Sequence, residues 1–477
     1  MVSASIALNR FGIGARPGES PPGDPKGWLL GQFDRFEPRP AAIAAVADSH
    51  AVAAALTDAA DQARRLRGDS GRKRQANGAD PAAAAARDAL DTGRRDARRA
   101  YVAAVGARME SALATPAPFV ERMVWFWANH FAVSIDKGGM VGFAGPFEFE
   151  AIRPHVLGSF GAMVNAVERH PAILLYLDQA RSIGPDSALG RRIAARGRRK
   201  AGINENLGRE AMELHTLGVR TGYSQADVTE FARALTGWTV AGRGNGFGAQ
   251  FAGDAGRPGD FVFAGRLHEP GVRTIMGKRY AQAGERQAQA VLDDLVASPA
   301  TAKHIAFKLA RHFAGDSPPQ PLVDRLAATY LGTKGDLPSL YRALIDSPEA
   351  WAPAPAKFKT PWEWSVSSLR AIGTEKVKPK MIDGILNQLG QPVWKPGSPA
   401  GYDDIAASWA GPDAILRRVE AARRLVGPAA GALDARRLAA TLYPAAVSAT
   451  TGEQLARAES PAQALALLLV APESMRR

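Results

Sequence analysis

The stretch from residue 204 to 217, NENLGREAMELHTL, concentrates side chains that could do chemistry. It holds three carboxylates, two asparagines, an arginine and a histidine in a pattern that otherwise predicts a helix. Gly218 is placed to end this helix, and residues 224–227, SQAD, resemble a capping box that would start a second one. The short connection GVRTGY between them predicts an antiparallel helical hairpin over 204–237.

Four carboxylates of this hairpin could share one site. On a wheel of 3.6 residues per turn, Glu210 and Glu213 lie on one stripe, and Asp227 and Glu230 lie on a stripe of the second helix. Carboxylates that converge repel one another unless arginines, shared protons or a cation balance them. Carboxylate sites for iron or manganese are built this way in helical bundles, although the Glu-x-x-His pairs of those sites are absent here. The pattern predicts a divalent metal site at these four residues.

A structural interpretation competes with the metal site. Glu210 and Glu213 could pair with Arg209, Arg220 or Arg233. Such arginine–carboxylate pairs often lock a helical hairpin without any ligand. Asp227 could do no more than cap its helix. Both interpretations remain open from the sequence alone.

Three of the eight histidines are candidates for acid–base chemistry. His130 ends an aromatic stretch, His215 lies near a predicted helix end, and His268 precedes the turn Glu-Pro-Gly. Two of them have a structural alternative: a buried core histidine for His130, and a cation stabilised by the helix dipole for His215. If carboxylates hold a cation, a histidine would complete its shell or move a proton. The candidates are therefore catalytic His130, His215 and His268; substrate-binding Arg209, Arg233 and Asn206; and metal-binding Glu210, Glu213, Asp227 and Glu230.

Other common chemistries are not indicated by the sequence. The chain of 477 residues has no cysteine, which excludes disulfides, thiolate metal sites and cysteine nucleophiles. It also contains no G-x-S-x-G elbow, no P-loop and no H-E-x-x-H motif.

The elements that would position these residues are mainly helical. Alanine-rich segments of helical period and clear helix caps predict one large α domain over 1–477, built of helical hairpins. Short apolar runs broken by Glu-Pro-Gly predict a small β-hairpin over 259–282. The net charge of +13 is uneven. Residues 61–100, with eleven basic and six acidic side chains, predict a charged low-complexity excursion, and 183–202 predicts a basic inserted loop.

Several segments together carry a resemblance to a known family. They are NRFGIGARPGE at the start, MVWFWANHFAVS at 123–134, NENLGREAMELHTLGV at 204–219, GYSQADVTEFARALTGWTV at 222–240, HIAFKLARHF at 304–313, KFKTPWEW at 357–364 and LGQPVW at 389–394. In this order the chain resembles the bacterial family known as domain of unknown function 1800. The resemblance implies a largely helical protein of about this length and implies no activity. Family members are often encoded beside a second family with export signals, which implies an exported protein as a partner.

Two functions from different classes follow as hypotheses. The favoured one is a metal-dependent or acid–base enzyme, a hydrolase or oxidoreductase, centred on the 204–237 hairpin. The rival is a non-catalytic scaffold in which the polar cluster is structural and the basic residues 187–202 bind an acidic partner. The N-terminus has no apolar segment of signal-peptide length, and no stretch approaches 18 apolar residues, so we expect a cytoplasmic protein without a membrane span.

Overall fold

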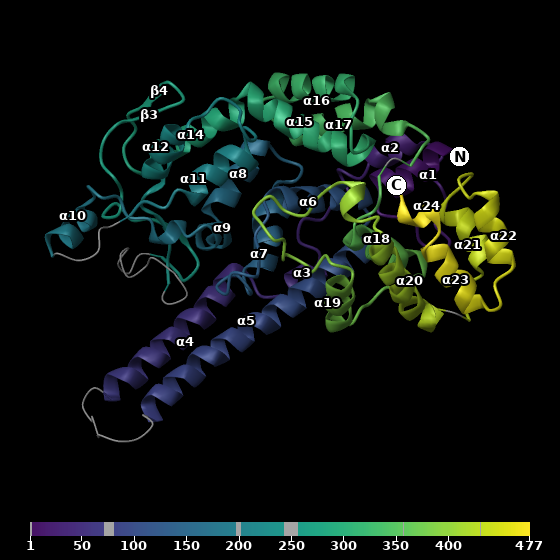
Figure 1. The fold of residues 1–477 in the computed structure, drawn as a ribbon, viewed down its shortest axis with the longest axis horizontal. Coiled ribbons are helices and arrows are strands. Elements are labelled where there is room, and N and C mark those ends of the chain that lie inside the picture. Colours follow the sequence, from purple (N-terminus) through teal and green to yellow (C-terminus); the bar gives the residue numbers. More distant parts are fainter. Residues whose placement is uncertain (1, 71–80, 197–201, 243–255, 356, 430) are drawn as a thin grey trace.

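The structure is a computed structural model that describes residues 2–70, 81–196, 202–242, 256–355, 357–429 and 431–477. The predicted mainly α fold with a small β-hairpin is confirmed. Helices surround one extended hydrophobic core, and a long helical hairpin extends away from it (Figure 1). No described helix is long and apolar enough to cross a membrane.

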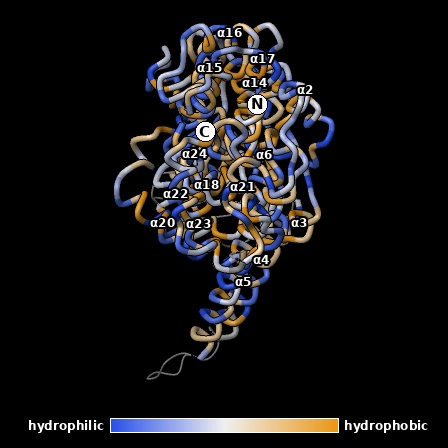
Figure 2. Tube along the Cα trace, turned by 90° about the vertical axis from the view of Figure 1, so that its right-hand side faces the viewer, coloured by the Kyte–Doolittle hydropathy of each residue, from blue (hydrophilic) through white to orange (hydrophobic). Residues whose placement is uncertain are grey.

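The N-terminal part ends in the projecting hairpin, which extends below the rest of the molecule in Figure 2. Its two helices, α4 and α5, pack through a narrow seam of Ala63, Ala86 and Ala89 flanked by Leu66 and Leu90. This pair covers much of the charged excursion expected over 61–100, and residues 71–80 of that range lie outside the described residues. The elements of this part are α1 (Val2–Ile6), η1 (Ala7–Phe11), α2 (Pro25–Leu30), α3 (Ala41–Ala44), α4 (Ser49–Ser70) and α5 (Pro81–Ala114).

The next part contains the aromatic helix α6 and the predicted helical hairpin of α11 and α12. Pro118 is the first residue of α6, where its missing N–H costs nothing. The expected loop 183–202 contains the short helix α10, and residues 197–201 lie outside the described residues. The elements are α6 (Pro118–His130), α7 (Ala144–Phe147), η2 (Glu148–Ile152), η3 (Arg153–His155), α8 (Phe160–Arg169), α9 (Pro171–Tyr176), η4 (Gln179–Arg181), α10 (Ala188–Ala195), α11 (Asn206–Glu210), η5 (Ala211–His215) and α12 (Gln225–Leu235).

Two small antiparallel sheets follow. Strands β3 (Arg273–Ile275) and β4 (Lys278–Tyr280) form a hairpin within the range 259–282. Strand β2 (Phe261–Phe263), which lies in the same range, pairs instead with β1 (Trp238–Val240). This second sheet was not expected, because β1 directly follows the helix α12 and lacks an alternating pattern of its own.

Helices α14 to α17 form one layer, and the remaining helices gather at the C-terminal end of the molecule (Figure 1). Helix α15 begins after Ser298, whose side chain accepts a hydrogen bond from the N–H of Ala300. The elements are α14 (Glu285–Ala297), α15 (Pro299–Ala314), α16 (Gln320–Gly332), α17 (Leu337–Asp346), η6 (Pro348–Trp351), α18 (Pro361–Ala371), α19 (Pro379–Gln388), η7 (Ala406–Ser408), α20 (Pro412–Val426), η8 (Gly427–Ala429), α21 (Ala435–Leu442), α22 (Ala449–Ala456), α23 (Pro461–Leu469) and α24 (Pro472–Met475).

Candidate functional site

The predicted hairpin exists, but its first helix is not a regular α-helix. After α11, residues Ala211–His215 form the π-helical turn η5, in which the backbone bonds span five residues. A wheel of 3.6 residues per turn therefore misplaces Glu213, which lies in the π-helical turn, relative to Glu210 at the end of α11. The capping box of the second helix is confirmed, since Ser224 and Asp227 exchange hydrogen bonds at its start.

Three of the four predicted carboxylate ligands have separate partners. Glu213 pairs with Arg209 at 3.4 Å, and Glu230 pairs with Arg233 at 3.2 Å. Asp227 caps its helix and also accepts a 2.6 Å hydrogen bond from the N–H of Met276. Among the described residues, no group of three or more histidine, aspartate and glutamate side chains could hold a metal ion. The predicted metal ligands Glu210, Glu213, Asp227 and Glu230 therefore do not form a ligand set here.

The remaining polar candidates of this region also lie apart. Asn206 is exposed, and its backbone N–H donates to the side chain of Asn204. Arg233 forms a second ion pair with Glu269 at 3.3 Å. His268 donates from Nδ1 to the carbonyl of Thr236 at 2.8 Å and takes part in none of the contacts that His130 makes.

The other two candidate histidines meet beside a cavity of about 380 Å³. His130 lines it, and its Nε2 lies 3.1 Å from the carbonyl oxygen of His215. Leu214 brings the hairpin to the cavity wall, while the ring of His215 is fully buried behind it and donates to Glu168 at 2.7 Å. The walls come from α6, from α15, from the start of α18 and from residues 391–404.

The protonation of His130 follows from its contacts. A carbonyl oxygen only accepts, so Nε2 carries the proton and donates to His215. Nδ1 then holds a lone pair, and it accepts a 2.9 Å hydrogen bond from Nζ of Lys308. Burial and the charge of Lys308 lower the pKa of His130 well below its usual value, which keeps the ring neutral.

Lys308 belongs to a run of cavity residues on α15. His304, Lys308 and His312 recur every four residues, so they share one face of the helix and all line the cavity. The opposite face, with Ala306 and Ala310, is buried in the core. Burial lowers the pKa of Lys308 to about 8 and that of His304 to about 4. One helix thus presents a lysine and two histidines to the same space.

The aromatic part of the wall includes a strained residue. Trp394 has a backbone φ of 49°, a left-handed conformation that is unusual for a bulky side chain. Its carbonyl accepts from the N–H of Ile135 at 3.0 Å, and its ring nitrogen donates to Glu148 at 2.8 Å. Glu148 also holds Arg108, whose guanidinium lies 4.1 Å from the ring centre of Trp362. Strain maintained by such contacts is typical of functional sites.

The loop beside Trp394 is fixed to α6. Both the amide nitrogen and the amide oxygen of Asn129 bond the backbone of Tyr402, at 2.8 and 2.7 Å. Gly401 allows this close approach, because a Cβ there would lie 2.3 Å from the carbonyl of Asn129. The aromatic ring of Tyr402 is thereby held at the cavity.

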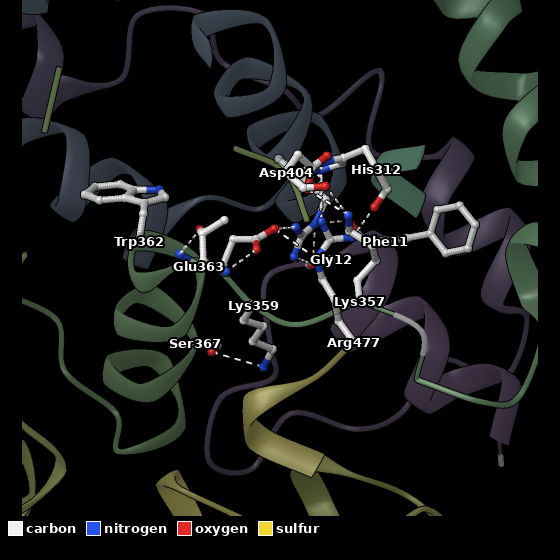
Figure 3. A network of polar contacts seen from close by, with 12 residues as sticks. Phe11, Gly12, His312, Lys357, Lys359, Trp362, Glu363, Ser367, Asp404 and Arg477 are labelled. Carbon is white, nitrogen blue, oxygen red and sulfur yellow. Dashed lines mark hydrogen bonds and ion pairs between the residues drawn. The ribbon is translucent and has the colours of Figure 1, made fainter. Parts of the chain in front are cut away.

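A buried ion network lies along one side of the cavity (Figure 3). Glu363 accepts from the backbone of Thr360 at the start of α18 and pairs with Arg122, and with Arg477 at 2.9 Å. Burial alone would raise the pKa of Glu363, but the charges of Arg477 and Arg122 lower it to about 2. Arg477 also donates to the backbone carbonyl of His312 at 2.6 Å. The network therefore joins distant parts of the chain behind one wall.

His312 completes this side of the cavity. Its Nδ1 donates to Asp404 at 2.9 Å, and Asp404 is paired with Lys357 at 3.0 Å. Burial and the charge of Arg477 lower the pKa of His312 to about 4. Asp404 stays ionised, because His312 and Lys357 outweigh its burial and hold its pKa below its usual range.

Sequence reasoning missed most of this site. It did not identify His304, Lys308, Arg311, His312 or Trp394. Two signals could have found them: the four-residue spacing of His304, Lys308 and His312, and the position of the cavity residues in five of the segments that carry the family resemblance.

The comparison with known proteins agrees with that resemblance. The family model described as "Protein of unknown function (DUF1800)" matches residues 6–476. No curated protein and no solved structure matches the chain. Because the family match spans nearly all of the chain, the protein belongs to the DUF1800 family of proteins of unknown function.

Proposed function

We propose that the protein is an enzyme that moves a proton on a small molecule bound in the cavity, with Lys308 as the group that gives and takes it. The observation that carries the proposal is the 2.9 Å hydrogen bond between Nζ of Lys308 and Nδ1 of His130 in the cavity wall. His130 has no second proton to give in this arrangement, so its role is to fix the position of the amine.

The acidity of Lys308 supports this role. An acid or base works best when its pKa lies near the working pH, because both forms are then populated. Burial lowers the pKa of Lys308 to about 8, within reach of neutral pH. The ammonium form can donate a proton to a bound molecule, and the amine form can take one back.

His304 offers a second polar contact for a ligand. Its Nδ1 donates to the carbonyl of Thr216 at 2.7 Å, which leaves Nε2 as an acceptor. With a pKa of about 4, the ring is neutral at pH 7. The aromatic walls supply the apolar surface that small-molecule sites usually have.

The cavity is a better place for this chemistry than the α11–α12 hairpin. Arg209 and Arg233 pair with Glu213 and Glu230 there, which favours the structural interpretation of the hairpin. The metal-dependent form of the enzyme hypothesis lacks a ligand set within the described ranges. The acid–base form remains and is the one we propose.

The test is proton exchange with solvent. Carbonyl compounds and carboxylic acids with a hydrogen on the adjacent carbon are incubated with the protein in D₂O, and loss of that hydrogen is followed by ¹H NMR. We expect catalysed exchange that rises with pH up to about 8, as Lys308 loses its proton. Lys308→Met should slow it by about 10²- to 10⁴-fold. Equal exchange by the parent and by folded Lys308→Met would contradict the proposal, and Glu213→Gln is the matched control.

A further inference from the structure

Two positive side chains of α15 reach the cavity without an ion-pair partner among the described residues, and the carboxylate of Asp404 acts on Lys308 only from beyond ion-pair distance. Lys308 hydrogen-bonds His130, and in the described part of the chain no carboxylate lies within ion-pair distance of it. Arg311 lies one turn further along and contacts the ring of Phe307 and the carbonyl of Asp316. It also forms no ion pair with any described carboxylate. Buried or half-buried cations usually have such partners, so these two leave a site for an anionic group of a ligand.

The amine of Lys308 can also act as a nucleophile. A lysine is activated for attack on a carbonyl when it is desolvated or lies next to another cation, and Lys308 meets both conditions. One N–H is used by Nδ1 of His130, which fixes the nitrogen at the wall. In the amine form the lone pair is free to react.

We propose that the cavity binds a 2-oxo acid with an apolar body, that Arg311 holds its carboxylate, and that Lys308 forms an imine with its keto carbon. This inference deepens the proposed function and rests on it, because the imine would acidify the hydrogen on the adjacent carbon. Lys308 is then bonded to the substrate, so the free Nε2 of His304 would take that proton and return it. The aromatic walls, with Phe126, Trp394 and Tyr402, fit the apolar body.

The covalent step balances without any further reactant. The Nζ lone pair attacks the keto carbon, a C–N bond forms, and one N–H proton moves to the former carbonyl oxygen. That oxygen takes a second proton from the solvent, which had received one when the Lys308 ammonium became an amine, and leaves as water with the electrons of the C–O bond. The product is a protonated imine, and no oxidation or reduction occurs.

The experiment traps this imine. The full-length protein is incubated with phenylpyruvate and sodium borohydride, and intact-mass and peptide mass spectrometry locate the adduct. Phenylacetone, which has the same body without the carboxylate, is the matched probe. We expect one adduct on Lys308. Its added mass equals that of phenylpyruvic acid less one oxygen, because reduction restores the two hydrogens that leave as water. Phenylpyruvate should label about tenfold faster than phenylacetone, and Arg311→Gln should remove the difference.

Variants separate this chemistry from loss of folding. Lys308→Arg keeps the positive charge and cannot form the imine, so the adduct should disappear while the melting temperature holds. Lys303→Met removes an exposed lysine of the same helix and should leave labelling unchanged. An adduct spread evenly over surface lysines, or one that survives Lys308→Arg, would overturn the inference. Exchange in D₂O without any adduct would reject the imine and leave the proposed function standing; absence of both would reject both.

Discussion

Two regions of the molecule are rich in charge, and they are built in opposite ways. The ion pairs that join two residues of the α11–α12 hairpin link neighbours in sequence, as with Arg209 and Glu213, four residues apart. Beside the cavity they come from distant segments: Arg122 and Glu363 are separated by 241 residues. The hairpin groups are half-buried or exposed, whereas Arg122 and Glu363 are 1% and 5% exposed. A high local density of charge in the sequence therefore marks the half-buried and exposed ion pairs of the hairpin, whereas the buried pair of Arg122 and Glu363 has no signature in the local sequence.

The difference in burial sets the energies. An exposed ion pair contributes little, because water and salt screen it and ordering two long side chains costs entropy. A buried pair gains more from each contact, but removing one partner leaves the other charge without water or a counter-ion. The predictions below test this contrast, beginning with the largest expected effect.

Glu363→Gln should lower the free energy of unfolding by about 3–5 kcal/mol, because Arg122 and Arg477 would stay buried and lose their counter-charge. Urea unfolding at pH 7 measures the change. Glu213→Gln, the matched loss of a hairpin carboxylate, should cost less than about 1 kcal/mol. Equal costs at the two positions would remove the contrast between the regions.

Lys308→Met should stabilise the protein by about 1–2 kcal/mol at pH 7 while removing activity. The pKa of Lys308 is about 8 in the folded state and lower than in the unfolded chain, so the unfolded state binds this proton more tightly. Lys308 therefore destabilises the folded state, and this destabilisation should diminish as the pH rises from 8 toward 10.5. Parent and variant curves that stay parallel across this range would argue against a desolvated lysine.

Stability should fall as the pH drops below about 6.5, in part because of His130. Its pKa is lowered by burial, so the unfolded state takes up the proton first and is favoured in acid. The expected contribution is about 1.4 kcal/mol per pH unit until the folded ring itself titrates. Comparison of parent and His130→Gln by urea unfolding at pH 7, 6 and 5.5 measures it; an unchanged slope in the variant would show that His130 is not held neutral.

The smallest effect is expected within the hairpin itself. Burial raises the pKa of Glu210, and no ion pair with a described residue offsets it, whereas Glu213 pairs with Arg209. Glu210→Gln should therefore stabilise slightly and Glu213→Gln should destabilise slightly, each within about 1 kcal/mol. Thermal unfolding of the two single variants side by side would detect the opposite signs. A large loss from Glu210→Gln would restore an important role for this residue.

The helical fold and its caps were open to prediction because they depend on local sequence. The Ser224–Asp227 capping box is an example. The π-helical turn at 211–215 could not be predicted in this way. It places His215 against the buried Glu168, which is a distant residue in the sequence. Likewise β2 pairs with β1 rather than with its nearer neighbour, which only the folded core determines.

The candidate site was only partly open to prediction. His130 was identified from its aromatic helix, and the spacing of His304 and Lys308 on one face of α15 was available but not used. The meeting of His130 with Lys308 joins α6 to α15 and could not follow from either helix alone. The same holds for Glu363 and Arg477, whose contact depends on how α18 meets the C-terminal residues.

The most direct test compares the two regions by activity. Proton exchange in D₂O is measured for the parent, for Lys308→Met and for the double variant Glu210→Gln/Glu213→Gln, with folding checked by melting temperature. The account predicts that exchange is lost in Lys308→Met and retained in the hairpin variant. Exchange that survives Lys308→Met and disappears in the hairpin variant would contradict it and return the chemistry to residues 204–237.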